Sequence, residues 1–289
     1  MNTKILELHD SLTRLSLAPA VGGSIVNWTV LQNDQPLLRP SDPLVRQNAS
    51  PRQLACYPLV PWSNRIGNGG FANPDGWLAL QANADNSPLP IHGSAWQQPW
   101  EVVSHTQSSA VLRLDSQIPF PFLAEQHFTL QDGRLSIHLQ VQHKGEHPAW
   151  YGLGLHPYFP RSAHTQLQAV AEKVWLCGAD QLPTHEQERP FTWNFDTPQA
   201  LPATGVDNAF THWNGHARII EPVAGYQLDI QAQGCPLYLL FCPENMPFFC
   251  FEPVTHPVNA HHMNERPGLE LLHAQERTDI HFSLHYRTL

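Results

Sequence analysis

The chain has 289 residues, of which 42% are hydrophobic and only 14% carry a charged side chain. A disordered chain has the opposite balance, so this sequence is expected to fold around a large apolar core. The 16 Lys and Arg residues against 25 Asp and Glu residues give a formal net charge of −9. Duplex DNA requires a dense basic face, and an anionic membrane surface repels an acidic protein. We therefore expect neither a nucleic-acid partner nor a membrane partner.

Signals for membrane insertion, secretion and disulfide formation are missing from the sequence. No run of about 18 consecutive apolar residues, the length that spans a bilayer, occurs in it. Residues 1–10 include acidic side chains and lack the apolar stretch of a secretory signal. The five cysteines are scattered without a CxxC pair, which argues against a disulfide framework or a structural zinc site. The expected location is the reducing cytoplasm.

Proline content and residue alternation predict an all-β protein. The 27 prolines are spread along the whole chain, and a proline inside a helix costs about 3 kcal/mol. Apolar and polar residues alternate with a period of two in residues 135–142, 227–232 and 280–287. Asp132-Gly133 predicts a two-residue hairpin turn, and the apolar run 237–241 predicts a strand buried on both faces.

No repeat, linker or charge block divides the chain, so residues 1–289 are expected to form one large antiparallel β-sandwich domain. A helical turn is expected at residues 52–56, while residues 167–176 fit a helix or a strand equally well. The exposed strand faces carry Gln, His, Asn, Ser and Trp, and the chain has 18 His and nine Trp. Such groups suit a neutral polyhydroxylated ligand, although a low-charge surface with no ligand explains the composition equally simply.

Two candidate binding segments combine polar groups with glycines or aromatic rings. In residues 64–71, Asn64 and Arg65 stand among glycines, where the backbone can approach a ligand and the guanidinium can hold two sugar oxygens. In residues 91–96, His92 precedes a glycine and Trp96 could stack on a sugar ring. Each segment has a purely structural alternative, a turn in the first case and a packed loop in the second.

Three further side chains could carry or support proton transfer. His156 lies between glycines and rigid residues, and histidine exchanges a proton near neutral pH. Asp207 is a carboxylate in an apolar setting that needs a partner or a ligand hydroxyl. Glu252 follows four apolar residues, and burial there would raise its pKa toward that of a general base working near neutrality. The structural alternatives are a core histidine, a turn and a strand-end glutamate.

A metal site is conceivable in the histidine-rich segment that contains His256, His261 and His262. The spacing of these residues is not HExxH, and no carboxylate lies at a metalloprotease-like offset. The sequence also lacks a phosphate-binding glycine loop, a serine nucleophile elbow and a dinucleotide fingerprint. We therefore expect no metal and no cofactor.

Taken together and in this order, the segments resemble the aldose 1-epimerase (galactose mutarotase) family. The resemblance runs nearly end to end and rests on five short motifs. These are Asn64-Arg65-Ile66, His92-Gly93, His156-Pro157-Tyr158-Phe159, Val206-Asp207-Asn208-Ala209-Phe210 and the Glu252 segment. Pro157 and residues 253–257 depart from the better-known galactose enzymes and are similar to a divergent bacterial branch. Hexose-6-phosphate relatives carry an arginine shortly after His-Gly, whereas residues 94–98 contain no cation.

The resemblance implies the family's large β-supersandwich and assigns roles to the motif residues. Glu252 looks like the catalytic base, His156 like the catalytic acid, and His92 like a second active-site histidine near the ring oxygen. Arg65 and Asp207, with Asn64 and Trp96 beside them, are expected to bind the sugar. The implied reaction opens a cyclic aldose as Glu252 takes the O1 proton and a protonated His156 donates to O5. Activity should then fall in acid as Glu252 protonates and in alkali as His156 deprotonates.

Three other functions remain open from the sequence. A hexose-6-phosphate 1-epimerase would use the same pair of groups on a phosphorylated sugar. A carbohydrate-binding or sensing protein would keep the hydroxyl-binding groups without catalysis. A glycoside hydrolase would need two carboxylates, for which Asp207 and Glu252 could be proposed. The expected partner is a small sugar in every case, and both a monomer and a homodimer are compatible with the sequence.

Overall fold

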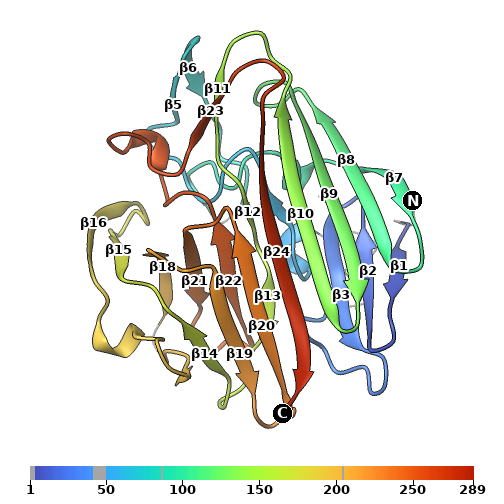
Figure 1. The fold of residues 1–289 in the computed structure, drawn as a ribbon. Helices are drawn as coiled ribbons and strands as arrows, with labels where there is room; N and C mark the ends of the chain where they lie inside the picture. The colour runs from blue at the N-terminus through green and yellow to red at the C-terminus, as the bar shows by residue number, and fades with distance from the viewer. Residues whose placement is uncertain (1–3, 42–49, 86, 204) are drawn as a thin grey trace.

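A computed structural model describes residues 4–41, 50–85, 87–203 and 205–289. Strands dominate it, and every pairing between the named strands is antiparallel, which confirms the all-β prediction. Two large sheets form most of the molecule, and β24 (Arg277–Thr288) lies near the middle of the larger one (Figure 1). Among the described residues, no helix is long and apolar enough to cross a membrane.

The nine-stranded sheet has the order β17 (Gln199–Ala200), β14 (Gln166–Ala169), β19 (His216–Glu221), β20 (Tyr226–Gln233), β24, β10 (Arg134–His143), β9 (Phe122–Gln131), β8 (Ser109–Ser116) and β7 (Glu101–His105). The eight-stranded sheet has the order β16 (Pro183–Glu188), β15 (Lys173–Cys177), β18 (Val206–Thr211), β21 (Leu237–Cys242), β22 (Phe248–Val254), β12 (Gly154–Leu155) and β4 (Pro58–Leu59), with β13 (Tyr158–Pro160) also paired to β22.

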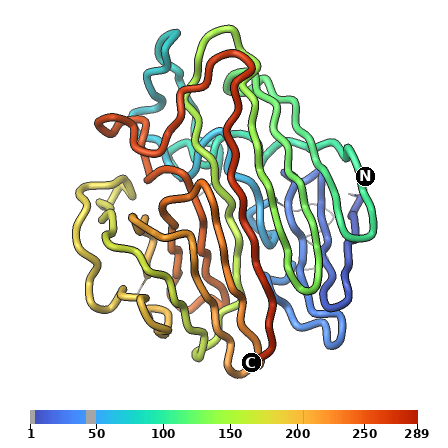
Figure 2. The backbone as a smooth tube through the Cα atoms, viewed as in Figure 1, coloured from blue at the N-terminus to red at the C-terminus, as the bar shows by residue number. Residues whose placement is uncertain are grey.

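Smaller elements complete the described chain. A three-stranded sheet consists of β1 (Leu6–His9), β2 (Thr13–Ala18) and β3 (Ser24–Val30). Two further strand pairs are β5 (Gly70–Asn73) with β6 (Gly76–Ala79) and β11 (Ala149–Tyr151) with β23 (Glu270–Leu272). The 3₁₀ turns are η1 (Pro51–Gln53), η2 (Ala95–Gln97), η3 (Phe191–Trp193) and η4 (Ala260–His262). The first strand ends beside the β7–β8 turn, where the His9 N–H donates to the Gln107 carbonyl at 2.7 Å. Figure 2 shows the backbone of β1 beside that of the β7–β8 hairpin.

The strand predictions hold where local sequence decides the structure. Gln131 pairs with Arg134 around Asp132 and Gly133, which have φ values of 50° and 74°, as a tight hairpin turn requires. In β21, five of the six residues are buried, which confirms a strand covered on both faces. The helical turn expected at residues 52–56 is instead the shorter η1, whereas residues 167–176 contribute to strands β14 and β15.

Alternation along the eight-stranded sheet separates two apolar layers. In β22, Phe249 and Phe251 belong to a large core cluster that extends in sequence from Leu6 to Leu284. Cys250 and Val254 belong to a second cluster on the opposite face of the same strand. Because successive side chains of a strand point to opposite faces, Glu252 shares the face of Cys250 and Val254. This second face is where the candidate site lies.

Candidate active site

The predicted acid and base meet in direct contact on this second face. The Nε2 atom of His156 lies 3.3 Å from Oε1 of Glu252, and the two side chains are only 8% and 4% exposed. Glu252 sits in the middle of β22, opposite Leu239 of β21. His156 directly follows β12, and its backbone N–H donates to the Tyr57 carbonyl at 3.0 Å. Strands far apart in the sequence therefore bring the two groups together.

Two tyrosine rings pack against the His156 imidazole. Tyr57 lies at a centroid distance of 4.6 Å and an interplanar angle of 29°, and Tyr158 at 4.6 Å and 18°. The two tyrosine rings also contact each other, with centroids 6.3 Å apart. The guanidinium carbon of Arg39 lies 3.6 Å from the Tyr158 ring centroid, and this guanidinium donates to the Leu54 carbonyl at 2.6 Å. His156 is therefore part of an aromatic cluster that packs beside Glu252.

Burial controls the protonation of this pair. Burial raises the pKa of Glu252 well above its ordinary value, and the negative charge of Asp207 acts in the same direction. Burial lowers the pKa of His156 well below its ordinary value, helped by the positive charges of Arg52 and Arg39. Burial therefore favours the uncharged form of the pair, with one proton on Glu252 beside a neutral imidazole. This differs from the expected starting state of an ionised glutamate and a protonated histidine, because burial disfavours both charged forms.

His92 lies close to the pair in a defined tautomer. The Asn64 backbone N–H donates to Nδ1 of His92 at 3.0 Å, and the His92 N–H donates back to the Asn64 carbonyl at 3.0 Å. Since Nδ1 accepts, the neutral ring carries its proton on Nε2. Burial lowers the pKa of His92 well below its ordinary value, which keeps the ring neutral. The ring centroid is 5.2 Å from that of His156, so His92 can donate to a ligand bound at the pair.

The glycine after His92 is required by a close approach of two backbone segments. Gly93 has a φ of +64°, and a Cβ there would lie 2.2 Å from the Val60 carbonyl oxygen. No other residue fits that space without moving the backbone. The His-Gly pair in the sequence therefore reflects a turn that presents the imidazole at the site.

Arg65 and Asp207 form an ion pair near Glu252, a contact that the sequence analysis did not predict. Nη1 of Arg65 lies 3.3 Å from Oδ2 of Asp207 and donates to Oδ1 of Asn64 at 3.2 Å. Asn259 supports this loop, because its N–H donates to the Arg65 carbonyl at 3.1 Å and its Oδ1 accepts from Gly67 N–H at 2.9 Å. Asp207 is about one-third exposed, at 34%, so its oxygens remain accessible to a ligand.

Trp96 is nearly fully buried and stacks on Tyr57 at 5.5 Å rather than standing free as a platform. Its edge lines a cleft of about 770 Å³ that Tyr158 and Phe241 also line. Phe241 pairs with Asp207 and Cys250 across the sheet, so the cleft adjoins the face of the candidate residues, but His156, Glu252 and Asp207 do not line it themselves. The cleft is large enough for a sugar, since ligand pockets of about 300–1,000 Å³ are usual.

Sequence reasoning gave no role to several residues that shape the site. Tyr158 lies two residues beyond His156 on a strand-like path, so a period of two places both side chains on one face. Tyr57 and Asn259 come from distant loops, and nothing in their local sequence marks them. Arg39 and Arg52 both line the cleft, and the sequence analysis gave a binding role to neither.

The histidine-rich segment has other roles in the structure. Nε2 of His256 accepts from the Ser63 N–H at 3.0 Å, and Nδ1 donates to the Pro257 carbonyl at 2.8 Å. His261 is buried against Phe71 at a centroid distance of 4.0 Å, and His262 contacts the Gly70 carbonyl through Nε2 at 2.7 Å. Both nitrogens of His256 are thus occupied by backbone groups.

Ligand-capable atoms of His156, Cys250 and Glu252 do lie within 4.8 Å of one another, and all three residues are buried. Burial raises the pKa of Cys250 and of Glu252 well above their ordinary values, which favours the protonated form of each. Metal binding requires deprotonated ligands, and it would therefore have to displace these protons. The donor set suits proton transfer better than metal binding.

The sequence profile of the Aldose 1-epimerase family matches residues 4–285, and the chain belongs to that family. The chain is similar to Escherichia coli protein YphB, with 32% identity over 259 residues covering 86% of this chain and 88% of that protein. The crystal structure of a putative aldose 1-epimerase from Escherichia coli superposes with a TM-score of 0.92 at 30% identity, covering 99% of each chain. A Caenorhabditis elegans GalM/aldose epimerase homologue shares the fold, with a TM-score of 0.84, 17% identity and 99% coverage of each chain. These similarities confirm the resemblance inferred from the five motifs.

Proposed function

We propose that the protein is an aldose 1-epimerase that interconverts the α and β anomers of a free aldohexose through Glu252 and His156. The observation that carries this proposal is the 3.3 Å contact between the buried carboxyl and the imidazole. In a pyranose the anomeric O1 and the ring oxygen O5 are both bonded to C1. An acid and a base that serve these two oxygens can therefore lie next to each other.

Ring opening can proceed without exchanging a proton with solvent. The single proton of the pair first moves from Glu252 to His156, which leaves the net charge unchanged. Glu252 then takes the proton from O1–H while the C1–O5 bond breaks, its electron pair goes to O5, and His156 donates its proton there. Glu252 is again protonated and His156 neutral, the state that burial favours. Rotation about C1–C2 and the reverse transfers close the ring on the other face.

The surrounding groups supply binding and orientation. The Nε2–H of His92 can donate to a sugar oxygen near the pair, while Arg65 and Asp207 can hold hydroxyls on the remainder of the ring. Because the sugar is already held in place when it binds, less entropy is lost in reaching the transition state, and the barrier is lower. Each positioned proton transfer contributes about 10²–10⁴-fold.

The test is saturation-transfer NMR of anomer exchange on a panel of free aldohexoses with catalytic amounts of the protein. We expect exchange well above the buffer rate for at least one free aldohexose. Exchange at the buffer rate throughout the panel, together with measurable sugar binding, would favour the carbohydrate-binding alternative and refute the proposal. Cleavage of an aryl glycoside would instead point to a hydrolase using Asp207 and Glu252.

A phosphorylated aldose is a second candidate because the cleft contains two guanidinium groups. Arg39 and Arg52 line it beside Trp96, although no cation follows His92-Gly93 in the sequence. Guanidinium groups pair well with phosphate oxygens. Hexose 6-phosphates therefore belong in the same panel, and a higher kcat/KM for them than for free hexoses would replace the free-sugar assignment.

A further inference from the structure

Three histidines lie directly opposite one another on the outer face of the nine-stranded sheet. His127 of β9 pairs with His138 of β10, which in turn pairs with His281 of β24. The sequence neighbours Ile137 and Phe282 point into the large core, so these imidazoles point away from it. This row of histidines is remote from the Glu252 face and has no part in the proposed reaction.

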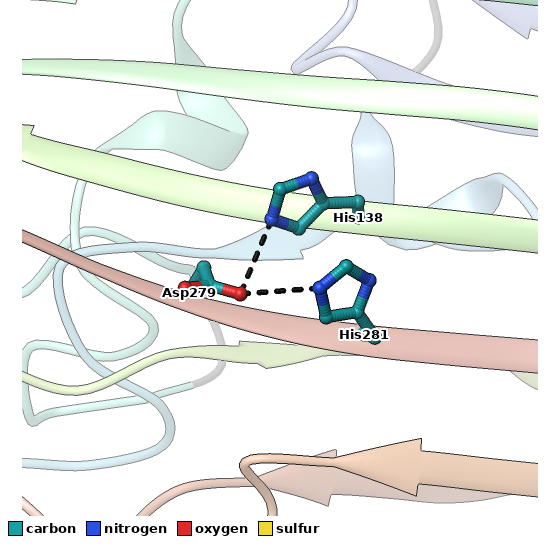
Figure 3. A group of neighbouring side chains, drawn as sticks. All are labelled: His138, Asp279 and His281. Atoms are coloured by element: carbon teal, nitrogen blue, oxygen red, sulfur yellow. Dashed lines mark hydrogen bonds and ion pairs between the residues drawn. The ribbon is translucent and has the colours of Figure 1, made fainter.

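Asp279 brings two of these imidazoles to one point. Its Oδ2 lies 3.2 Å from Nε2 of His138 and 3.3 Å from Nε2 of His281. Figure 3 shows the two rings leaving neighbouring strands and directing a nitrogen toward the same carboxylate oxygen. The rings are nearly parallel, with centroids 4.1 Å apart and an interplanar angle of 5°. The three ligand-capable atoms all lie within 4.8 Å of one another.

We propose that His138, Asp279 and His281 bind one divalent transition-metal ion, with an open coordination position facing solvent. Zn²⁺ bonds to imidazole nitrogen and carboxylate oxygen are about 2.0–2.2 Å long, so adjacent ligand atoms around a tetrahedral ion lie roughly 3.3–3.5 Å apart. The observed nitrogen–oxygen separations of 3.2 and 3.3 Å nearly match that spacing. The two rings are parallel, so each must turn about its side-chain bonds for both Nε2 lone pairs to meet at one ion.

The surroundings leave these three side chains available to a cation. Burial and the neighbouring His281 lower the pKa of His138, which favours the neutral imidazole that binds a metal ion. Glu125 lies in the same row as Asp279 but is already paired with Arg113 at 2.7 Å, so the carboxylate available to an ion is that of Asp279. The side chains of His138, Asp279 and His281 are 30%, 50% and 54% exposed, so an ion can reach them from solution.

The strands also make the site rigid before an ion arrives. β10 pairs with β24 over nine consecutive residue pairs that include His138 with His281. A bound ion would add a bond between two strands that lie far apart in the sequence. Because it would bind only the paired form, it should stabilise the folded protein.

The experiment is calorimetric titration of the untagged full-length protein with ZnCl₂, repeated on His138→Gln, His281→Gln and His127→Gln. We expect one Zn²⁺ per chain and an affinity loss of more than about 100-fold in each of the first two variants, which exceeds the loss from an outer partner. His127→Gln is the matched control, since Nε2 of His127 is directed at Glu125 at 3.2 Å, and it should retain the affinity. All three changes lie on the surface, and circular dichroism checks that each variant is folded.

Two results would overturn the proposal. One is the absence of zinc binding to the unmodified protein. The other is zinc binding that persists in both His138→Gln and His281→Gln, for example at the buried His156, Cys250 and Glu252 group, where it would also inhibit anomer exchange. Neither result bears on the anomer exchange of the metal-free protein, so this site and the proposed function are tested separately.

Discussion

The substitution Glu252→Gln tests the proposed base with the smallest change in shape. The amide keeps the shape of the carboxyl and can donate its N–H to Nε2 of His156, 3.3 Å away, but it cannot take up the O1 proton. One positioned proton transfer is worth about 10²–10⁴-fold, which corresponds to about 3–5 kcal/mol at 1.36 kcal/mol per tenfold. Because the Glu252 side chain is only 4% exposed, little space exists for water to replace it. We therefore expect kcat to fall by roughly 10³–10⁴-fold, with sugar binding retained.

The assay is saturation-transfer NMR with the best sugar of the panel, with sugar affinity measured separately by calorimetry. Glu221→Gln is the matched control, because Glu221 is a buried carboxyl in the nine-stranded sheet that accepts hydrogen bonds from Ser162 and Thr165. The control should keep its kcat. A loss below about tenfold in Glu252→Gln, or an equal loss in the control, would refute a catalytic role for Glu252.

Three further predictions follow from the geometry of the site. Activity should be constant while the pair of His156 and Glu252 holds one proton; it should fall in acid below the lowered pKa of His156 and in alkali above the raised pKa of Glu252. Long-range nitrogen NMR checks this assignment, and an imidazolium at His156 at pH 7 in the free protein would contradict it. Asp207→Asn removes a negative charge that raises the pKa of Glu252, so the fall of activity in alkali should begin at a lower pH. KM should rise as well, because the carboxylate no longer holds a sugar hydroxyl. An unchanged alkaline limb in the pH–rate profile would show that the charge of Asp207 does not affect Glu252. Gly93→Ala would place a Cβ 2.2 Å from the Val60 carbonyl oxygen, at a residue whose φ is +64°. The free energy of unfolding, measured by urea denaturation, should therefore fall by about 1–3 kcal/mol. A loss within about 0.5 kcal/mol, the range of ordinary surface changes, would mean that the turn relaxes freely.

Features set by neighbouring residues could be predicted from the sequence. The turn at Asp132-Gly133 needs positive φ at two adjacent positions, and those residue types adopt it readily. The carboxyl of Glu252 is buried because apolar residues flank it, which gave the right direction for its pKa. The family motifs named His156 and Glu252 individually, but a linear sequence does not give the distance between them.

Features that depend on pairing between distant strands could not be predicted. The stacking of Tyr57 on His156 joins residues about a hundred positions apart, and it contributes to a burial that leaves the imidazole neutral. The row of outer-face histidines is similar, since His138 and His281 each appear in an alternating run that looks like an ordinary exposed face. Only the register of β10 against β24 puts them side by side.

The number of residues in β22 decides which of its side chains face which apolar layer. Phe249 and Phe251 face one apolar layer, and Cys250 and Glu252 face the other. Inserting one residue early in this strand would exchange those faces, placing an acid in the main interior and a phenyl ring beside His156. Stability and the pair of His156 and Glu252 would be lost together. Relatives that keep this pair are therefore expected to vary in length in their loops, while the number of residues in β22 before the glutamate stays the same.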